Sequence, residues 1–250
     1  MADDTSIGGT RGEFPVTRWS AVVAARSADA AERTRALDAL LAAYWKPVYK
    51  YIRLRWGKSN EDAKDLTQEF FVRLVEKDLL GSYDPARAHL RTYLRTCVDG
   101  LVLNEDKAAR RLKRGGDVSH VSLDFDAAEG ELAHAGVPGA GSPADVFERE
   151  WIRSLFAAAV EALRTECEVR GKTTHFRLFE LYDLEDAGRG GRTYADLARQ
   201  FNLRVTDVTN HLAYARREFR RIALEKLREM TATDEEFRRE GRDLFGVEPE

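Results

Sequence analysis

The 250-residue sequence has only two cysteines, six prolines and two methionines. Cys97 and Cys167 lie far apart in the chain, which supports neither a disulfide framework nor a thiolate metal site, so we expect two small buried hydrophobic residues. With 43% hydrophobic residues and so little proline, the composition excludes a collagen, a disordered tail and a disulfide-stapled miniprotein. It leaves one or two domains with enough apolar mass for a core.

Long apolar runs are also missing. Nowhere do about eighteen apolar residues follow one another, which is the length that a membrane-spanning helix needs. The N-terminal residues lack the basic start, apolar middle and small-residue cleavage site of a secretory signal. We therefore expect a cytoplasmic protein that has no membrane partner.

The net charge of -3 conceals a segregation of charge along the chain. Residues 33–114 hold 18 basic and 11 acidic side chains, whereas residues 115–150 hold one basic and eight acidic ones. Residues 151–230 are again net basic. This pattern suggests two modules that touch a polyanion, joined by a linker that does not bind the same surface. Uneven solvation of helical surfaces would give the same counts.

Apolar residues recur at three- and four-residue spacing through residues 33–114, which predicts a helical domain. We expect Pro47 to interrupt its first helix and Ser59 to cap a second helix that begins near Asn60. Asp84-Pro85 has the sequence of a further helix start.

The acidic segment that follows has six glycines, many alanines and no sustained period, which is typical of a flexible linker. Helical spacing resumes at Ser142-Pro143, and strand alternation is not evident in the sequence. The sequence therefore predicts an all-α protein with two helical domains joined by a flexible acidic linker. The expected segments are an N-terminal extension (1–30), a first domain (31–114), the linker (115–142), a second domain (143–230) and a C-terminal tail (231–250).

Residues 193–217 have the pattern of a helix, a tight turn and a second helix. Thr193 is expected to cap the first helix, Asn202 to take the left-handed turn conformation and Thr206 to cap the second helix. Polar residues that face outward near the start of the second helix are typical of a recognition helix in the major groove. A packed pair of helices without a ligand would give the same apolar pattern. The candidate DNA contacts are Thr206, Asp207, Thr209, Asn210, His211, Tyr214, Arg216, Arg217 and Arg220.

Three separated motifs together resemble bacterial sigma factors of the extracytoplasmic-function (ECF) group, in the sigma-70 family. Residues 60–75 resemble the polymerase-binding helix, residues 90–114 the promoter-melting and minus-ten-binding helix, and residues 193–217 the minus-thirty-five-binding helix-turn-helix. The motifs occur in the order of the family. The resemblance implies a region 2 helical bundle and a region 4 helix-turn-helix that bind core RNA polymerase and promoter DNA, with no catalysis, cofactor or metal.

The resemblance also assigns residues to two further surfaces. Those expected to face polymerase are Asp62, Asp65, Gln68, Glu69 and Arg73, and those expected at the minus-ten element are Tyr93, Arg95, Asn104, Lys107, Arg110, Arg111, Lys113 and Arg114. Acids three or four residues apart form one polar ridge for a basic partner, although a solvated helix face has the same pattern. An aromatic ring beside cations suits an unpaired strand, but Tyr93 fits the core equally well.

The family's recognition helix often carries more basic residues than this one, so base preference here is expected to rest on Asn210, His211 and Tyr214. The implied polymerase contacts are the clamp of the largest subunit and the flap of the second-largest subunit. An anti-sigma factor is a further candidate partner, and the tail at 231–250 is either a control element or a frayed end.

Two other classes of function remain open at this point. A helix-turn-helix regulator that binds an operator without polymerase would leave residues 60–75 idle or use them for dimerisation. An enzyme would need a hydrolytic or metal site from Asp62, Asp65, Asp84 and His89. The sequence offers no activated nucleophile, phosphate-cradling glycine loop or His/Cys ligand spacing for it.

Overall fold

A computed structural model describes residues 20–109, 123–134, 142–185 and 191–246, and all regular secondary structure in these ranges is helical. The predicted all-α fold is confirmed. The first domain contains α1 (Ala21–Ala24), α2 (Ala30–Trp56), α3 (Asn60–Glu76), the 3-10 helix η1 (Leu79–Ser82) and α4 (Leu90–Ala109). None of the helices in the described part of the chain is long and apolar enough to cross a membrane.

Capping residues determine helix boundaries in the first domain, and two of the predicted boundaries are wrong. Ser59 caps α3, as expected, because its Oγ accepts from the Asp62 backbone N–H at 3.1 Å. The expected break at Pro47 is wrong: Pro47 is buried inside a continuous α2. The expected helix start at Asp84 is also wrong, because the Asp84 carboxylate accepts from the Ala86 N–H at 3.0 Å in a turn, and α4 begins at Leu90.

The expected second domain contains α6 (Pro143–Val169), α7 (Thr173–Phe179), the π-helix η2 (Glu180–Glu185), α8 (Tyr194–Phe201) and α9 (Val205–Glu229). The expected start at Ser142 is confirmed by a reciprocal capping box with Asp145. Thr193 caps α8 in the same way, as predicted. Thr206 is not a cap, however, because α9 begins at Val205, with Arg204 in the N-cap position two residues before Thr206.

Asn202 holds the turn between α8 and α9 in the left-handed conformation, with φ 53° and ψ 48°. A β-branched side chain is strained there. We expect Asn202→Val to lower the free energy of unfolding by about 1–2 kcal/mol and Asn202→Gly to leave it nearly unchanged. Urea unfolding of the two variants beside the wild type measures the difference, and equal stability of both would show that the turn changes conformation at no cost.

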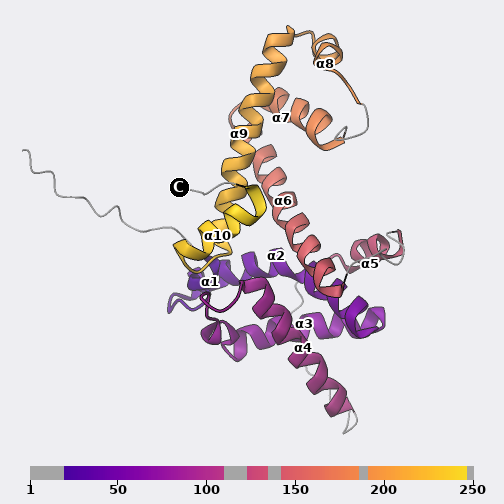
Figure 1. Cartoon of the computed structure of the whole chain (residues 1–250), viewed down its shortest axis with the longest axis vertical. Coiled ribbons are helices and arrows are strands. Elements are labelled where there is room, and N and C mark those ends of the chain that lie inside the picture. Colours follow the sequence, from indigo (N-terminus) through magenta and orange to yellow (C-terminus); the bar gives the residue numbers. More distant parts are fainter. Residues whose placement is uncertain (1–19, 110–122, 135–141, 186–190, 247–250) are drawn as a thin grey trace, which may run out of the picture.

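Helix α6 belongs to both hydrophobic cores. Its N-terminal half contributes Phe147, Trp151 and Leu155 to the core around α2, and its C-terminal half contributes Leu163 and Cys167 to the core around α7, α8 and α9. Figure 1 shows that α6 runs from the first domain to the helices of the second domain. Helix α8 and the C-terminal end of α4 lie at opposite ends of the molecule. Cys167 is buried and Cys97 half-buried, and both thiols are free.

Two further helices lie against the first domain. Helix α5 (Phe125–His134) forms within the segment expected to be a linker without regular structure, so that expectation is wrong for these residues. Helix α10 (Asp234–Phe245) forms in the C-terminal tail and buries Phe237 in the first core. It packs between the lower end of α9 and the first domain, so the described part of the tail is not a frayed end.

Candidate polymerase and nucleic-acid interfaces

Helix α3 presents an acidic ridge to solvent. Ala63, Phe70 and Leu74 bury one side of the helix, and Asp62 and Asp65 are exposed on the other. The carboxylates of these two residues form no ion pair with any described residue. Both side chains are therefore exposed, and their contact with polymerase stays a prediction.

The rest of the predicted ridge also holds the domain together. Gln68, Glu69 and Arg73 are half-buried. The Arg73 guanidinium pairs with Glu69 in its own helix at 2.5 Å and with Glu105 of α4 at 2.6 Å. Desolvation lowers the pKa of Arg73, but the hydrogen bonds that its guanidinium donates to both carboxylates together outweigh this and raise the pKa above its ordinary value. Arg73 thus fixes the angle between α3 and α4 in addition to facing outward.

The described part of α4 offers fewer contacts for an unpaired strand than expected. The Tyr93 hydroxyl donates to the Leu79 carbonyl, and its ring centroid lies 5.4 Å from that of Tyr83, so Tyr93 packs in the domain. Arg95 is half-buried and Asn104 is exposed. The Lys107 side chain, together with Arg110, Arg111, Lys113 and Arg114, lies outside the described residues.

An exposed stripe runs along α9 at spacings of three and four residues. Its members are Thr206, Asn210, Ala213, Arg217 and Arg220. We call these five residues α9's exposed stripe. Asn210 and Arg220 have no hydrogen-bond or ion-pair partner among the residues that the structure describes. Asp207 lies beside the stripe and pairs with Arg204 at 2.7 Å, and the Thr209 hydroxyl donates to the Val205 carbonyl. The stripe has the polar and cationic groups that bind base edges and the flanking phosphates.

His211 and Tyr214 do not face outward as expected. The His211 ring stacks on His175 of α7 with a centroid distance of 3.9 Å, and the Tyr214 ring meets the same imidazole edge-on at 5.1 Å. The Tyr214 hydroxyl also accepts from Arg170 at 3.2 Å. Both aromatic side chains therefore fix α9 against its neighbours. Of the three expected base readers, Asn210 is exposed, and His211 and Tyr214 are half-buried.

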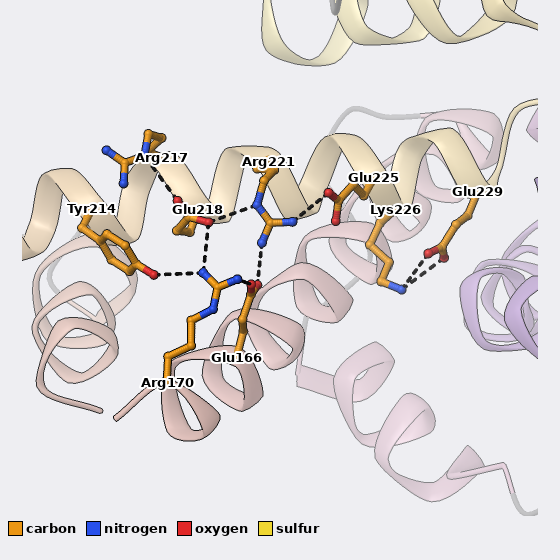
Figure 2. Close-up of polar contacts among 9 residues, drawn as sticks. All are labelled: Glu166, Arg170, Tyr214, Arg217, Glu218, Arg221, Glu225, Lys226 and Glu229. Atoms are coloured by element: carbon orange, nitrogen blue, oxygen red, sulfur yellow. Dashed lines mark hydrogen bonds and ion pairs between the residues drawn. The ribbon is translucent and has the colours of Figure 1, made fainter. Parts of the chain in front are cut away.

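A network of charges fixes α9 to α6, as Figure 2 shows. Arg221 of α9 pairs with Glu166 of α6 at 2.6 Å, and Arg170 of α6 pairs with the same carboxylate at 2.5 Å. On another side of α9, Arg216 binds Asp183 at 2.8 Å. Arg216, predicted as a DNA contact, is thus already engaged within the chain. Sequence spacing gave no sign of these pairs, because the partners lie far apart in the sequence.

The stacked histidines predict a pH effect on stability. Burial, followed by the neighbouring His211, lowers the pKa of His175 from 6.5 to about 4. Between these pH values the unfolded chain binds more protons, so the contribution of His175 to stability is complete above pH 6.5 and falls as the pH drops toward 4. We expect His175→Phe, which keeps an aromatic ring, to reduce the loss of stability between pH 7 and 5 in urea unfolding curves. An unchanged pH dependence would contradict the neutral, packed state of His175.

Comparison with known families adds one finding for the first domain. Residues 40–114 match Sigma-70 region 2. The match begins within α2 and includes all of α3, η1 and α4, and so both surfaces described for this domain. It supports a sigma-70 family sigma factor, which acts in promoter recognition and transcription initiation with core RNA polymerase and promoter DNA. No curated protein and no solved structure gives a significant match to the chain.

The Sigma-70 region 2 segment is bound on a further side by the C-terminal tail. Glu236 and Glu240 of α10 are both almost completely buried. Glu236 accepts a hydrogen bond from Tyr83, and Glu240 pairs with Arg91 and contacts His89. The sequence alone left this tail as either a control element or a frayed end, and nothing in it identified these two acids as buried.

The residues considered for an enzyme site do not form one in the described structure. His89 faces the Glu240 carboxylate, whereas Asp62 and Asp65 lie on the outer face of α3. Within the described ranges, no three His, Cys, Asp or Glu side chains are placed to hold a metal ion.

Proposed function

We propose that this protein is a sigma factor of the ECF type that binds core RNA polymerase through the acidic ridge of α3. In this proposal the clamp of the largest polymerase subunit faces Asp62 and Asp65, and the flap of the second-largest subunit faces the second domain. Both carboxylates are exposed and have no ion-pair partner among the described residues, which supports the first contact. Charges left unpaired on a helix surface favour a complementary basic surface and speed its encounter.

Promoter DNA is the second proposed partner. The C-terminal part of α4 is assigned to the minus-ten element, and α9's exposed stripe is assigned to the minus-thirty-five element. Helix α9 follows the turn in which Asn202 has the left-handed conformation, and this is the position of the recognition helix in a helix-turn-helix. Asn210 is the exposed amide of this stripe, and Arg217 and Arg220 follow about two and three turns later as phosphate contacts.

The observation that carries the proposal is the Sigma-70 region 2 match over α3 and α4, in one chain with an exposed helix-turn-helix. Transcription by sigma-free core polymerase from the same host tests it, with the purified full chain added and the transcripts sequenced. We expect RNA with defined start sites that disappears when the chain is left out. An absence of promoter-directed RNA would contradict the proposal.

Co-purification with core polymerase separates a sigma factor from a regulator that binds an operator alone. A sigma factor is retained by tagged core enzyme, whereas a regulator binds its DNA equally well without it. An anti-sigma factor, a further candidate partner, would be found as a host protein that prevents this retention.

Asn210 gives a prediction about specificity. Because an Asn side chain reads adenine through two hydrogen bonds, we expect Asn210→Ala to relax the base preference at one upstream position by about 1–3 kcal/mol. Arg220→Ala should instead weaken binding to all upstream sequences alike and flatten the salt dependence. Competition binding with a library of upstream elements measures both variants. Equal loss of affinity for every sequence in Asn210→Ala would remove this residue from base reading.

A further inference from the structure

Helix α5 covers an aromatic face of α2. Phe125 is 7% exposed, and its ring centroid lies 5.4 Å from Trp45 and 5.1 Å from Tyr49. Ala128, one turn further along, is completely buried. One aromatic ring of the acidic segment is thus inserted beside two aromatic side chains of the net-basic first domain.

The carboxylates of α5 lie against cations on either side of this aromatic contact. The ion pairs are Lys46–Glu131 (2.5 Å), Lys50–Glu131 (2.7 Å), Arg53–Glu129 (2.5 Å) and Lys64–Asp126 (3.6 Å). Hydrogen bonds from Arg53 hold the pKa of Glu129 below its ordinary value. The acidic segment therefore binds the basic domain, contrary to the expectation that a linker of this charge stays off such a surface.

The energy of this contact favours reversibility. Burial of Phe125 and the four ion pairs, whose carboxylates are at least partly exposed, stabilise this contact. The conformational entropy lost when the ten residues of α5 are fixed as a helix opposes it. A ligand that offers a planar ring and a row of anionic groups to the same face would therefore compete with α5.

We propose that the face of α2 and α3 under α5 binds a single strand of nucleic acid, and that α5 occupies it as an internal substitute. The α5-covered face is defined by Trp45, Lys46, Tyr49, Lys50, Arg53 and Lys64. In this arrangement a base takes the place of the Phe125 ring, and phosphates take the places of the Glu129 and Glu131 carboxylates. Aromatic side chains beside a row of cations are the usual components of single-strand binding.

Two observations favour a nucleic acid over an acidic protein segment. The face belongs to residues 33–114, the segment with the largest excess of basic side chains. The cations also continue from α2 onto α3, which suits a continuous chain of phosphates. This face is separate from the α4 and α9 surfaces assigned to promoter DNA, so the inference and the proposed function stand or fall independently.

The double variant Glu129→Gln, Glu131→Gln in the full chain tests the inference, because it removes the carboxylate partners of Lys46 and Arg53 without removing Phe125. Lys50 keeps its pair with Glu150, and Lys64 keeps its pairs with Asp126 and Glu61. Its affinity is measured by fluorescence anisotropy for labelled oligo(dT) and oligo(U) of about fifteen nucleotides, a typical single-strand site. We expect binding at least about tenfold tighter than wild type at 0.1 M salt. With about two additional phosphates neutralised, the slope of log K against log salt should steepen by about 1.4. The two oligonucleotides show whether DNA or RNA is preferred.

A matched control separates the face from net charge alone. Glu168→Gln, Glu235→Gln makes the same charge change at two exposed acids that have no ion pair with any described residue, and should tighten binding by no more than about twofold. We call the double variant Glu129→Gln, Glu131→Gln the opened variant. Adding Lys46→Gln and Lys64→Gln to it should return the affinity to that of the wild type. Circular dichroism checks the fold, and Phe125→Ala serves as a second opened variant if the first one unfolds.

A photo-crosslinking amino acid in place of Trp45 locates the bound strand. In the opened variant we expect crosslinks to the oligonucleotide, reduced by an excess of a peptide with the sequence of residues 123–134. The inference is overturned if the opened variants bind no more tightly than the charge control. It is equally overturned if the peptide binds and neither oligonucleotide displaces it, because the face would then be a site for an acidic helix.

Discussion

We expect the charge reversal Asp65→Arg to weaken the complex with core RNA polymerase by at least about 100-fold. Asp65 is exposed on α3 and has no ion-pair partner among the described residues, so the substitution breaks no contact that holds the region 2 bundle together. The whole effect therefore falls on the partner. Two like charges brought together in an interface cost several kcal/mol, and each 1.4 kcal/mol is a factor of ten in Kd.

The matched control for this prediction is Asp38→Arg. Asp38 is an exposed acid on α2 without a described ion pair, and its reversal changes the net charge by the same amount. Equilibrium binding of labelled core enzyme to the three proteins should therefore separate Asp65→Arg from both others. If Asp65→Arg binds as well as Asp38→Arg does, α3 does not face the polymerase.

Much of the local structure could be predicted because short-range chemistry determines it. Thr193 with Asp196, Ser142 with Asp145, and Asn202 each satisfy a hydrogen-bonding or backbone requirement within four residues, and all formed as expected. Pro47 failed as a signal because burial within α2 outweighs the loss of one backbone donor. Propensity alone does not include that burial.

The candidate site was harder to predict, because the expected side chains have alternative partners far away in the sequence. A helical wheel places His211 and Tyr214 near Asn210, yet His175 and Arg170, from α7 and α6, take both rings out of the exposed stripe. The acidic segment had no apolar period long enough to predict a helix. Its helix α5 depends on the aromatic and basic face of α2.

The largest effect on stability is expected at Glu240. Glu240 and Arg91 are 2% and 7% exposed, and they join α10 to the N-terminal end of α4. Replacing Glu240 by Ala leaves the Arg91 charge buried with only the half-exposed Glu148, at 2.6 Å, and the Trp151 ring beneath it. Removing one partner of a buried pair costs about 3–5 kcal/mol, and the remaining Glu148 contact places this case near about 3 kcal/mol. Urea unfolding of the full chain measures the loss.

Two comparisons show whether this loss comes from the unpaired charge. Glu235→Ala, at the exposed position on the same helix, should stay within about 0.5 kcal/mol of wild type. The double variant Arg91→Met, Glu240→Met should recover most of the stability, because an apolar pair of similar volume has no charge to desolvate. If Glu240→Ala is as stable as Glu235→Ala, the pair contributes no net free energy in solution. If the double variant is no more stable than Glu240→Ala, the loss comes from packing around α10 and not from the charge on Arg91.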